Sequence, residues 1–224
     1  MKTASETFFE EYCQRKGIRW KRIEESDVCT PDYDIYVPRR KVVVEVKEIA
    51  LNEDEKTAQR MYAERGFSSG RITPGHRVRK KISEASPQIK SRTRSRYPGL
   101  LVLFDRGFMV GHLDPYHIRV AMYGFETVQF AVPRDPRIDP HIIGARYGAK
   151  RKMTPEHNTS ISAIGVLHTP NRSSIELAVY HNMYAGIPLA PEALGKYGIP
   201  QFRIEESVPG CVPQWEQIEA LSKP

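Results

Sequence analysis

Cysteine is scarce in this sequence, which has only Cys13, Cys29 and Cys211 among its 224 residues. The number is odd, the three positions are far apart, and no Cys-x-x-Cys pair occurs. This usage excludes a disulfide framework and argues against a structural zinc site. There is also no signal-peptide hydrophobic segment. We therefore expect a protein of a reduced, cytoplasmic compartment.

Long hydrophobic runs are equally lacking. No apolar stretch approaches the ~20 residues needed to span a bilayer, so we expect a soluble protein with no membrane contact. The sequence has no Gly-rich loop ending in Lys-Ser/Thr, so no motif indicates ATP hydrolysis. It also has no His-Glu-x-x-His string of zinc peptidases, no nucleophile elbow and no internal repeat. The chain is long enough for one sizeable core, or for a core with an appended subdomain.

What the sequence does contain is a β-branched strand that carries charges. Residues Val42 to Lys47 read Val-Val-Val-Glu-Val-Lys. Alternation with a period of two places Val43, Glu45 and Lys47 on one face and three valines on the other. One face is therefore apolar, and the other carries the charged side chains that can take part in chemistry.

A second charged run precedes this strand, as Thr-Pro-Asp-Tyr-Asp-Ile from residue 30 to 35. Folding it back about residues 39 and 40 predicts that Asp34 lies opposite Glu45 and that Asp32 lies opposite Lys47. Opposed side chains have Cβ atoms roughly 5 Å apart, close enough for two carboxylates to bind one divalent ion. The lysine ammonium would then reach a bound water or a phosphate oxygen.

A simpler interpretation of the same residues stays open. Glu45 and Lys47 are then the solvated face of a half-buried hairpin, and Asp32 and Asp34 are turn or strand-end residues. Most Glu-x-Lys strings have this role.

The pattern Pro31-Asp32, a hairpin and then Glu45-Val46-Lys47 resembles the PD-(D/E)xK nuclease superfamily. The N-terminal half is similar to archaeal-type Holliday junction resolvases. The resemblance implies an α/β, restriction-endonuclease-like core of helix, three strands, helix and strand over about the first 105 residues. It also implies phosphodiester hydrolysis with Mg2+, for which Mn2+ can substitute.

Residue roles follow from the same resemblance. The implied catalytic residues are Asp32, Glu45, Lys47 and Glu6. The implied metal ligands are Asp32, Glu45, the carbonyl of Val46 and Glu6, with Asp34 as the alternative to Asp32 and with Glu10 or Glu11 as the alternatives to Glu6. Gln88 is expected to face solvent, because Tyr97 follows it at a longer interval than in the superfamily's glutamine and tyrosine pair.

Hydrophobic periodicity and capping signals predict the elements of the core. The first helix is expected to be capped by Ser5 and to run through Arg15. A further helix is expected to begin at a capping box, Asn52 with Glu55, to carry an apolar stripe at Ala58, Met61 and Tyr62, and to lie over the site as an insertion. The predicted strands are 18–23, the charged run 30–35, 42–47 and 100–104. A helix with an apolar face at Val78, Ile82, Ala85 and Ile89 is expected to be interrupted or to restart at Pro87.

The sequence pattern in the second half of the chain predicts a β-containing C-terminal extension. A helix over 114–123 and a strand over 126–132 precede a stretch rich in proline and charge, 133–140, which is the best domain boundary or a long loop. Two antiparallel strands, 161–168 and 174–181, are expected to extend the sheet. We therefore expect a nuclease core over 1–132 and an extension over 133–224 that packs on it.

Positive charge is concentrated between residues 71 and 97. The formal net charge is +7 and the pI is about 9.3, which favours a polyanionic partner. Glu84 is the only acid in the segment, and a phosphate-backbone track is predicted there; a solvated helix surface is the plainer interpretation. The basic residues of the segment include Arg71 and Arg96, and the predicted DNA contacts are Arg77, Arg79, Lys80, Lys81, Lys90, Arg92 and Arg94.

The combined expectation is a Mg2+-dependent DNA endonuclease of the structure-selective or the restriction and repair type. Two alternatives stay open. The first is a non-catalytic nucleic-acid-binding or assembly module that retains the fold. The second is a nuclease acting on RNA, because a basic track does not distinguish the two backbones. A homodimer is compatible with either activity.

Overall fold

The computed structural model describes residues 2–24, 29–38, 40–70, 72–105, 111–171, 174–204 and 214–219. Three positions of interest in the sequence, Arg39, Arg71 and Cys211, lie outside these ranges.

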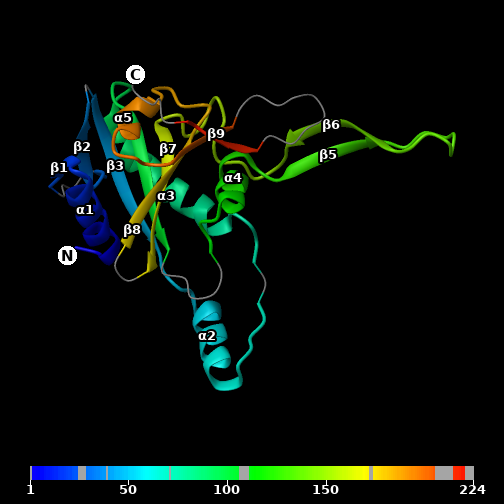
Figure 1. The fold of residues 1–224 in the computed structure, drawn as a ribbon, viewed down its shortest axis with the longest axis horizontal. Helices are drawn as coiled ribbons and strands as arrows, with labels where there is room; N and C mark the ends of the chain where they lie inside the picture. The colour runs from blue at the N-terminus through cyan, green and yellow to red at the C-terminus, as the bar shows by residue number, and fades with distance from the viewer. Residues whose placement is uncertain are drawn as a thin grey trace.

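The described part of the chain contains both helices and strands (Figure 1). In chain order they are α1 (Ala4–Lys16), β1 (Arg19–Arg22), β2 (Tyr33–Val37), β3 (Arg40–Ile49), α2 (Glu53–Arg65), α3 (His76–Thr93), β4 (Gly99–Asp105), α4 (Pro115–Tyr123), β5 (Glu126–Ala131), β6 (His141–Tyr147), β7 (Ile161–Asn171), β8 (Ser174–His181), α5 (Pro191–Gly195), β9 (Gln201–Ile204) and β10 (Trp215–Gln217).

One mixed sheet organises the chain, in the strand order β1-β2-β3-β4-β7-β8-β9-β10. The first three strands are antiparallel, β3, β4 and β7 run parallel, and β8 turns back antiparallel to β7. The protein therefore belongs to the α/β class. The predicted strands at 161–168 and 174–181 are confirmed as β7 and β8, and they do extend the sheet through β4.

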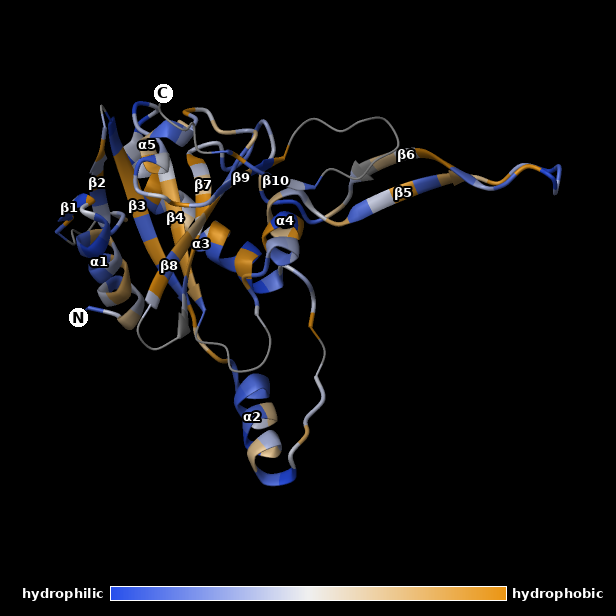
Figure 2. Cartoon of the chain, in the orientation of Figure 1, coloured by the Kyte–Doolittle hydropathy of each residue, from blue (hydrophilic) through white to orange (hydrophobic). Residues whose placement is uncertain are grey.

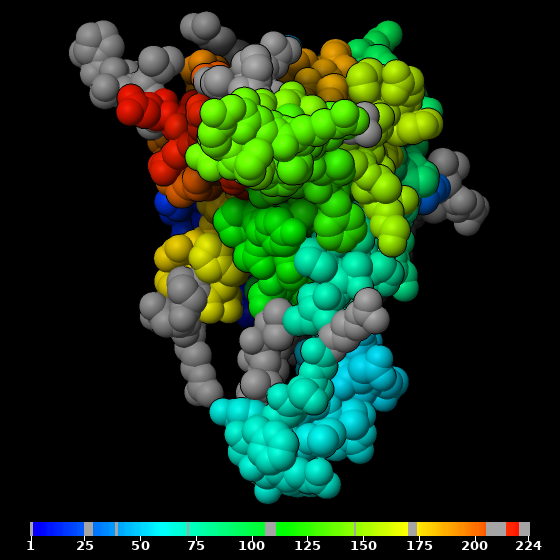
Figure 3. All heavy atoms as spheres, turned by 90° about the vertical axis from the view of Figure 1, so that its right-hand side faces the viewer, coloured from blue at the N-terminus to red at the C-terminus, as the bar shows by residue number. Residues whose placement is uncertain are grey.

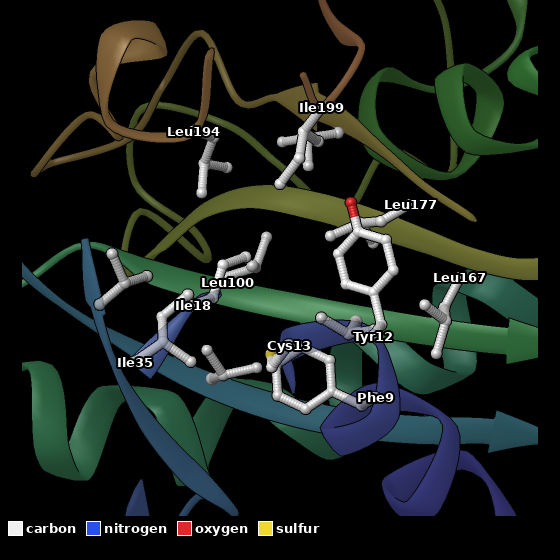
Figure 4. Close-up of a cluster of buried hydrophobic side chains, with 14 of the residues drawn as sticks. Phe9, Tyr12, Cys13, Ile18, Ile35, Leu100, Leu167, Leu177, Leu194 and Ile199 are labelled. Atoms are coloured by element: carbon white, nitrogen blue, oxygen red, sulfur yellow. The ribbon is translucent and has the colours of Figure 1, made fainter. Parts of the chain in front are cut away.

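Two hydrophobic clusters lie on the two faces of this sheet. On one face, α1 and α5 cover Val42, Val44 and Val46 of β3 together with β4, β7 and β8; Figure 4 shows Phe9, Tyr12 and Cys13 of α1 in this cluster. On the other face, α3 and α4 pack on β4 and β7. Figure 2 shows the resulting concentration of hydrophobic residues in the central strands. The apolar alternation of β3 thus selects the face that α1 covers.

Helix ends differ in part from the prediction. The first helix begins at Ala4 because Thr3, rather than Ser5, is its N-cap, and Thr3 forms a capping box with Glu6. The predicted box of Asn52 with Glu55 is confirmed at the start of α2. Helix α3 is not interrupted at Pro87 but continues from His76 to Thr93. Pro87 has no amide hydrogen to donate within the helix, but the apolar side chains of α3 are buried against the sheet, and this packing stabilises the helix.

Two elements project from the body. Helix α2 has no buried side chain and extends beyond the end of β3, so its predicted apolar stripe does not pack on the sheet (Figures 1 and 3). The hairpin of β5 and β6 extends away on the other side of the molecule (Figure 1). The proline-rich stretch 133–140 joins these two strands. None of the described helices is both long enough and apolar enough to cross a bilayer.

Candidate active site

The register of the β2–β3 hairpin decides which carboxylates meet. Val37 pairs with Arg40, so the chain reverses one residue earlier than predicted, and Asp34 lies opposite Val43 rather than Glu45. Continuing this register by one residue places Asp32 opposite Glu45. The prediction that Asp34 faces Glu45 and Asp32 faces Lys47 is therefore wrong by two residues. Because side chains alternate with a period of two, all four charged residues still share one face.

Glu45 is a buried carboxylate with little compensation. Its exposed fraction is 0 %, and neither of its oxygens accepts a well-formed hydrogen bond within the described part of the chain. Its ion-pair partner is Lys47, whose Nζ lies 2.6 Å from Oε1. Burial and the nearby Asp32 carboxylate raise the pKa of Glu45 to about 7, against the lowering effects of Lys47 and of the Asp32 backbone amide. The buried charge on Glu45 is therefore only partly compensated, and a nearby cation would stabilise it.

Asp32 is oriented by the strand it faces. Its Oδ2 accepts a hydrogen bond of 2.8 Å from the Val46 amide, which fixes one oxygen beside β3. Burial raises the pKa of Asp32, and Glu6 raises it further, while the Val46 amide and Lys47 lower it. Asp32 and Glu45 therefore interact electrostatically with each other and with one lysine. Carboxylate oxygens of this kind are the ligands that a hard divalent ion takes.

Glu6 lies close to this pair but is already bound. Its Oε2 accepts hydrogen bonds from the backbone and the hydroxyl of Thr3, at 2.6 and 2.9 Å, and its Oε1 accepts one of 2.9 Å from Arg22. The capping box and the ion pair account for its burial without any metal. In the described ranges, no three or more His, Cys, Asp or Glu side chains are grouped closely enough to hold a metal ion.

The two alternatives to Glu6 are placed differently. Glu10 pairs with Lys2 and accepts a 2.8 Å hydrogen bond from the hydroxyl of Tyr33, whereas Glu11 is exposed on α1. Glu10 therefore faces the β2 strand, and Glu11 faces solvent.

Asp34 belongs to a separate ion-pair network. Its Oδ1 accepts a 3.0 Å hydrogen bond from Nε of Arg92, and its Oδ2 accepts one from Nη2 of the same residue. Lys41 lies 3.5 Å from Oδ2. This bidentate pair compensates the buried charge of Asp34. It also joins the C-terminal end of α3 to the β2–β3 hairpin.

Gln88, expected to face solvent, is half-buried against the segment that precedes Asp32. Its Nε2 donates a 3.3 Å hydrogen bond to the carbonyl of Thr30, and Ser91 on the same flank of α3 donates a 2.9 Å hydrogen bond to the carbonyl of Cys29. These two contacts hold the chain immediately before Pro31 and Asp32. No local pattern reveals them, because the partners are about 60 residues apart.

The predicted basic track divides into paired, buried and unpaired cations. Three are neutralised, Arg77 by Glu55, Lys81 by Glu84 and Arg92 by Asp34. Arg79 is buried, with its guanidinium 5.7 Å from the centre of the Phe125 ring, and burial lowers its pKa. The exposed members without an ion-pair partner in the described chain are Lys80, Lys90 and Arg94.

Comparison with protein-family models, with curated proteins and with solved structures finds no match for this chain. Function is therefore argued from the geometry of the site itself.

Proposed function

We propose that this chain is a metal-dependent nuclease that hydrolyses phosphodiester bonds in DNA, on a restriction-endonuclease-like core. The observation that carries the proposal is Glu45, a fully buried carboxylate with a raised pKa that lies beside Asp32 and 2.6 Å from Lys47. A buried and poorly hydrogen-bonded acid is costly, and perturbed acids of this kind are concentrated at functional sites. The order of α1, β1, β2, β3, α3 and β4 supports the assignment, because it follows the core order of that superfamily with α2 inserted.

The donor set fits a hard divalent cation. One oxygen of Asp32 is fixed by the Val46 amide, and neither oxygen of Glu45 is well hydrogen-bonded. The carboxylate oxygens of both residues therefore lie beside the Lys47 ammonium and can act as ligands of a metal ion. Asp32, Glu45 and the carbonyl of Val46 would hold Mg2+, or Mn2+ in its place. When bound, the ion supplies charge neutralisation at the scissile phosphate and a lowered pKa for water.

Each residue of the chain has a defined task in this proposal. Lys47, freed from Glu45, donates hydrogen bonds to the attacking water or to the phosphate oxygen on which charge develops. Val46 orients Asp32 through its amide. Gln88 acts as a positioning residue, since it holds the segment before Asp32. Glu6 has the role of a helix cap, with a ligand role only if it leaves Arg22.

A non-catalytic nucleic-acid-binding module is the second candidate. The observation in its favour is that the oxygens of Glu6 are already bound by Thr3 and Arg22, which leaves fewer than three acids free for a metal. Such a module would bind nucleic acid with an affinity that is independent of Mg2+.

A cleavage panel separates the two candidates. Branched, nicked, linear and single-stranded DNA, together with RNA, are incubated with Mg2+, Mn2+ or a chelator. We expect cleavage of at least one DNA with a metal and none with the chelator. Glu45→Gln and Lys47→Met should bind that DNA without cutting it, whereas Glu64→Gln, at an exposed position of α2, should cut at the parent rate. The absence of cleavage with both metals, with binding retained, would favour the module, and cleavage of RNA alone would reassign the substrate.

A further inference from the structure

A cavity lies on the flank of α3 that faces away from the candidate active site. Its volume is about 640 Å³, within the range of about 300–1,000 Å³ that is typical of small-molecule sites. One wall is the C-terminal end of α3, with Lys90 and Arg94, and the other is the loop before β7, with Arg151 and Lys152. The basic residues of one wall are about 60 residues away in the sequence from those of the other wall.

Charge in this cavity is strongly one-sided. None of the four cations has an ion-pair partner in the described chain. The one acid in the lining, Glu156, accepts a 3.0 Å hydrogen bond from the hydroxyl of Thr154. Four unpaired cations around one hollow repel each other and produce a positive potential that is focused between the two walls. An anion bound there would remove this repulsion.

The backbone around the cavity is held in an unusual conformation. The non-glycine residues with positive φ in the described chain are Arg94, Ser95, Asn158 and Lys150, at 44°, 54°, 58° and 66°. The first three line the cavity, and Lys150 directly precedes Arg151. Strained positions of this kind are found where the surrounding structure fixes them, often at ligand sites.

A close contact at Gly99 brings the two walls together. A Cβ at this position would lie 2.3 Å from Cγ2 of Ile89 on α3 and 2.4 Å from the carbonyl oxygen of Ser160, which lines the cavity. Only glycine allows the loop before β7 to approach α3 this closely. The cavity is therefore part of the packed fold.

The cavity and the carboxylate site use different flanks of the same helix. Arg92 and Gln88 point to the β2–β3 side, where they contact Asp34 and Thr30. Lys90 and Arg94 line the cavity on the other side. The cavity thus shares no ion pair with the candidate active site.

We propose that this cavity is a binding site for a phosphate group. The two cations on each wall are opposite in charge to a phosphate, and lysine and arginine form short charge-assisted hydrogen bonds with its oxygens. Ser86, Ser95 and Thr159 line the same space, and their side chains carry hydroxyl groups that can act as neutral donors. The phosphate belongs either to a free nucleotide or to the backbone of a single strand. Both present the same group to the four cations.

Equilibrium binding to the full chain tests the proposal. The probes are adenosine 5′-monophosphate and a six-nucleotide single-stranded DNA, both with a chelator present so that no hydrolysis is required. We expect at least one probe to bind, and Arg94→Gln and Lys152→Gln, one from each wall, to weaken binding about tenfold each, the loss of one charge-assisted contact. Lys152→Arg should retain most of the affinity.

The matched control is Arg134→Gln, which removes the same charge from an exposed, unpaired position near the tip of the β5–β6 hairpin. It should change the affinity less than twofold, and unfolding midpoints of all variants should match the parent. Tighter binding of the nucleotide identifies a nucleotide site, and tighter binding of the oligonucleotide identifies a backbone site. Failure of both probes to bind, or equal losses in the control and the cavity variants, would overturn the proposal and leave the nuclease assignment unaffected.

Discussion

Replacing Glu45 by glutamine should remove a pH dependence of stability. The folded chain holds the proton of Glu45 more tightly than the unfolded chain, because burial and Asp32 raise its pKa from 4.5 to about 7. The contribution of Glu45 to the free energy of unfolding is therefore complete below pH 4.5 and is lost as the pH rises to 7. A pKa difference of this size corresponds to about 3 kcal/mol, a large fraction of the stability of a typical domain.

Urea unfolding with a chelator at pH 4.5, 6, 7 and 8 measures this effect as a difference between proteins. Glu45→Gln should match the parent at pH 4.5 and exceed it by about 3 kcal/mol at pH 8, since glutamine preserves the shape without the charge. Glu64→Gln, exposed on α2, should stay within about 0.5 kcal/mol of the parent at each pH. A difference between Glu45→Gln and the parent that does not change with pH would refute the claim that Glu45 is a strained buried acid.

Three further predictions concern the surroundings of the site. Mn2+ affinity of the parent should fall about tenfold per pH unit below pH 7, because the ligand carboxylate must be deprotonated; calorimetry at pH 5.5 to 8 measures this. Arg92→Gln should lower the free energy of unfolding by about 1–3 kcal/mol, since Lys41, at 3.5 Å, is then the one ion-pair partner of Asp34 within the described ranges; urea unfolding measures it. Lys80→Gln should flatten the plot of log DNA affinity against log salt by about one unit, whereas Lys81→Gln, paired with Glu84, should change it less.

Local patterns predicted the hairpin, its charged face and most elements correctly, because alternation and capping are encoded by neighbouring residues. The capping box of Thr3 with Glu6 follows the same Ser/Thr-x-x-Glu pattern and was readable, but Ser5 was predicted as the cap instead. The predicted register of the β2–β3 hairpin is wrong by two residues, because the register depends on the residues at which the turn reverses the chain. Alternation alone cannot distinguish register shifts of two residues.

Long-range pairing could not be predicted from the sequence. Arg92 and Asp34 are 58 residues apart and Arg77 and Glu55 are 22 apart, and the segment that looked like a continuous basic track is divided by such pairs. The cavity between α3 and the loop before β7 depends on the fold of β4 and β7. The short elements α5, β9 and β10 were not predicted, since they carry too few residues for a periodic signal.

The rates of Asp32→Asn and Asp34→Asn on the DNA that the parent cleaves, measured under single-turnover conditions with Mg2+, test the central claim most directly. Asp32 faces Glu45 and Lys47, whereas Asp34 is bound by Arg92. We predict that Asp32→Asn loses a factor of about 10³ or more, as expected when metal-assisted stabilisation is lost, and that folded Asp34→Asn stays within about tenfold of the parent. Parent-like cleavage by Asp32→Asn, with or without a loss in Asp34→Asn, would contradict the account.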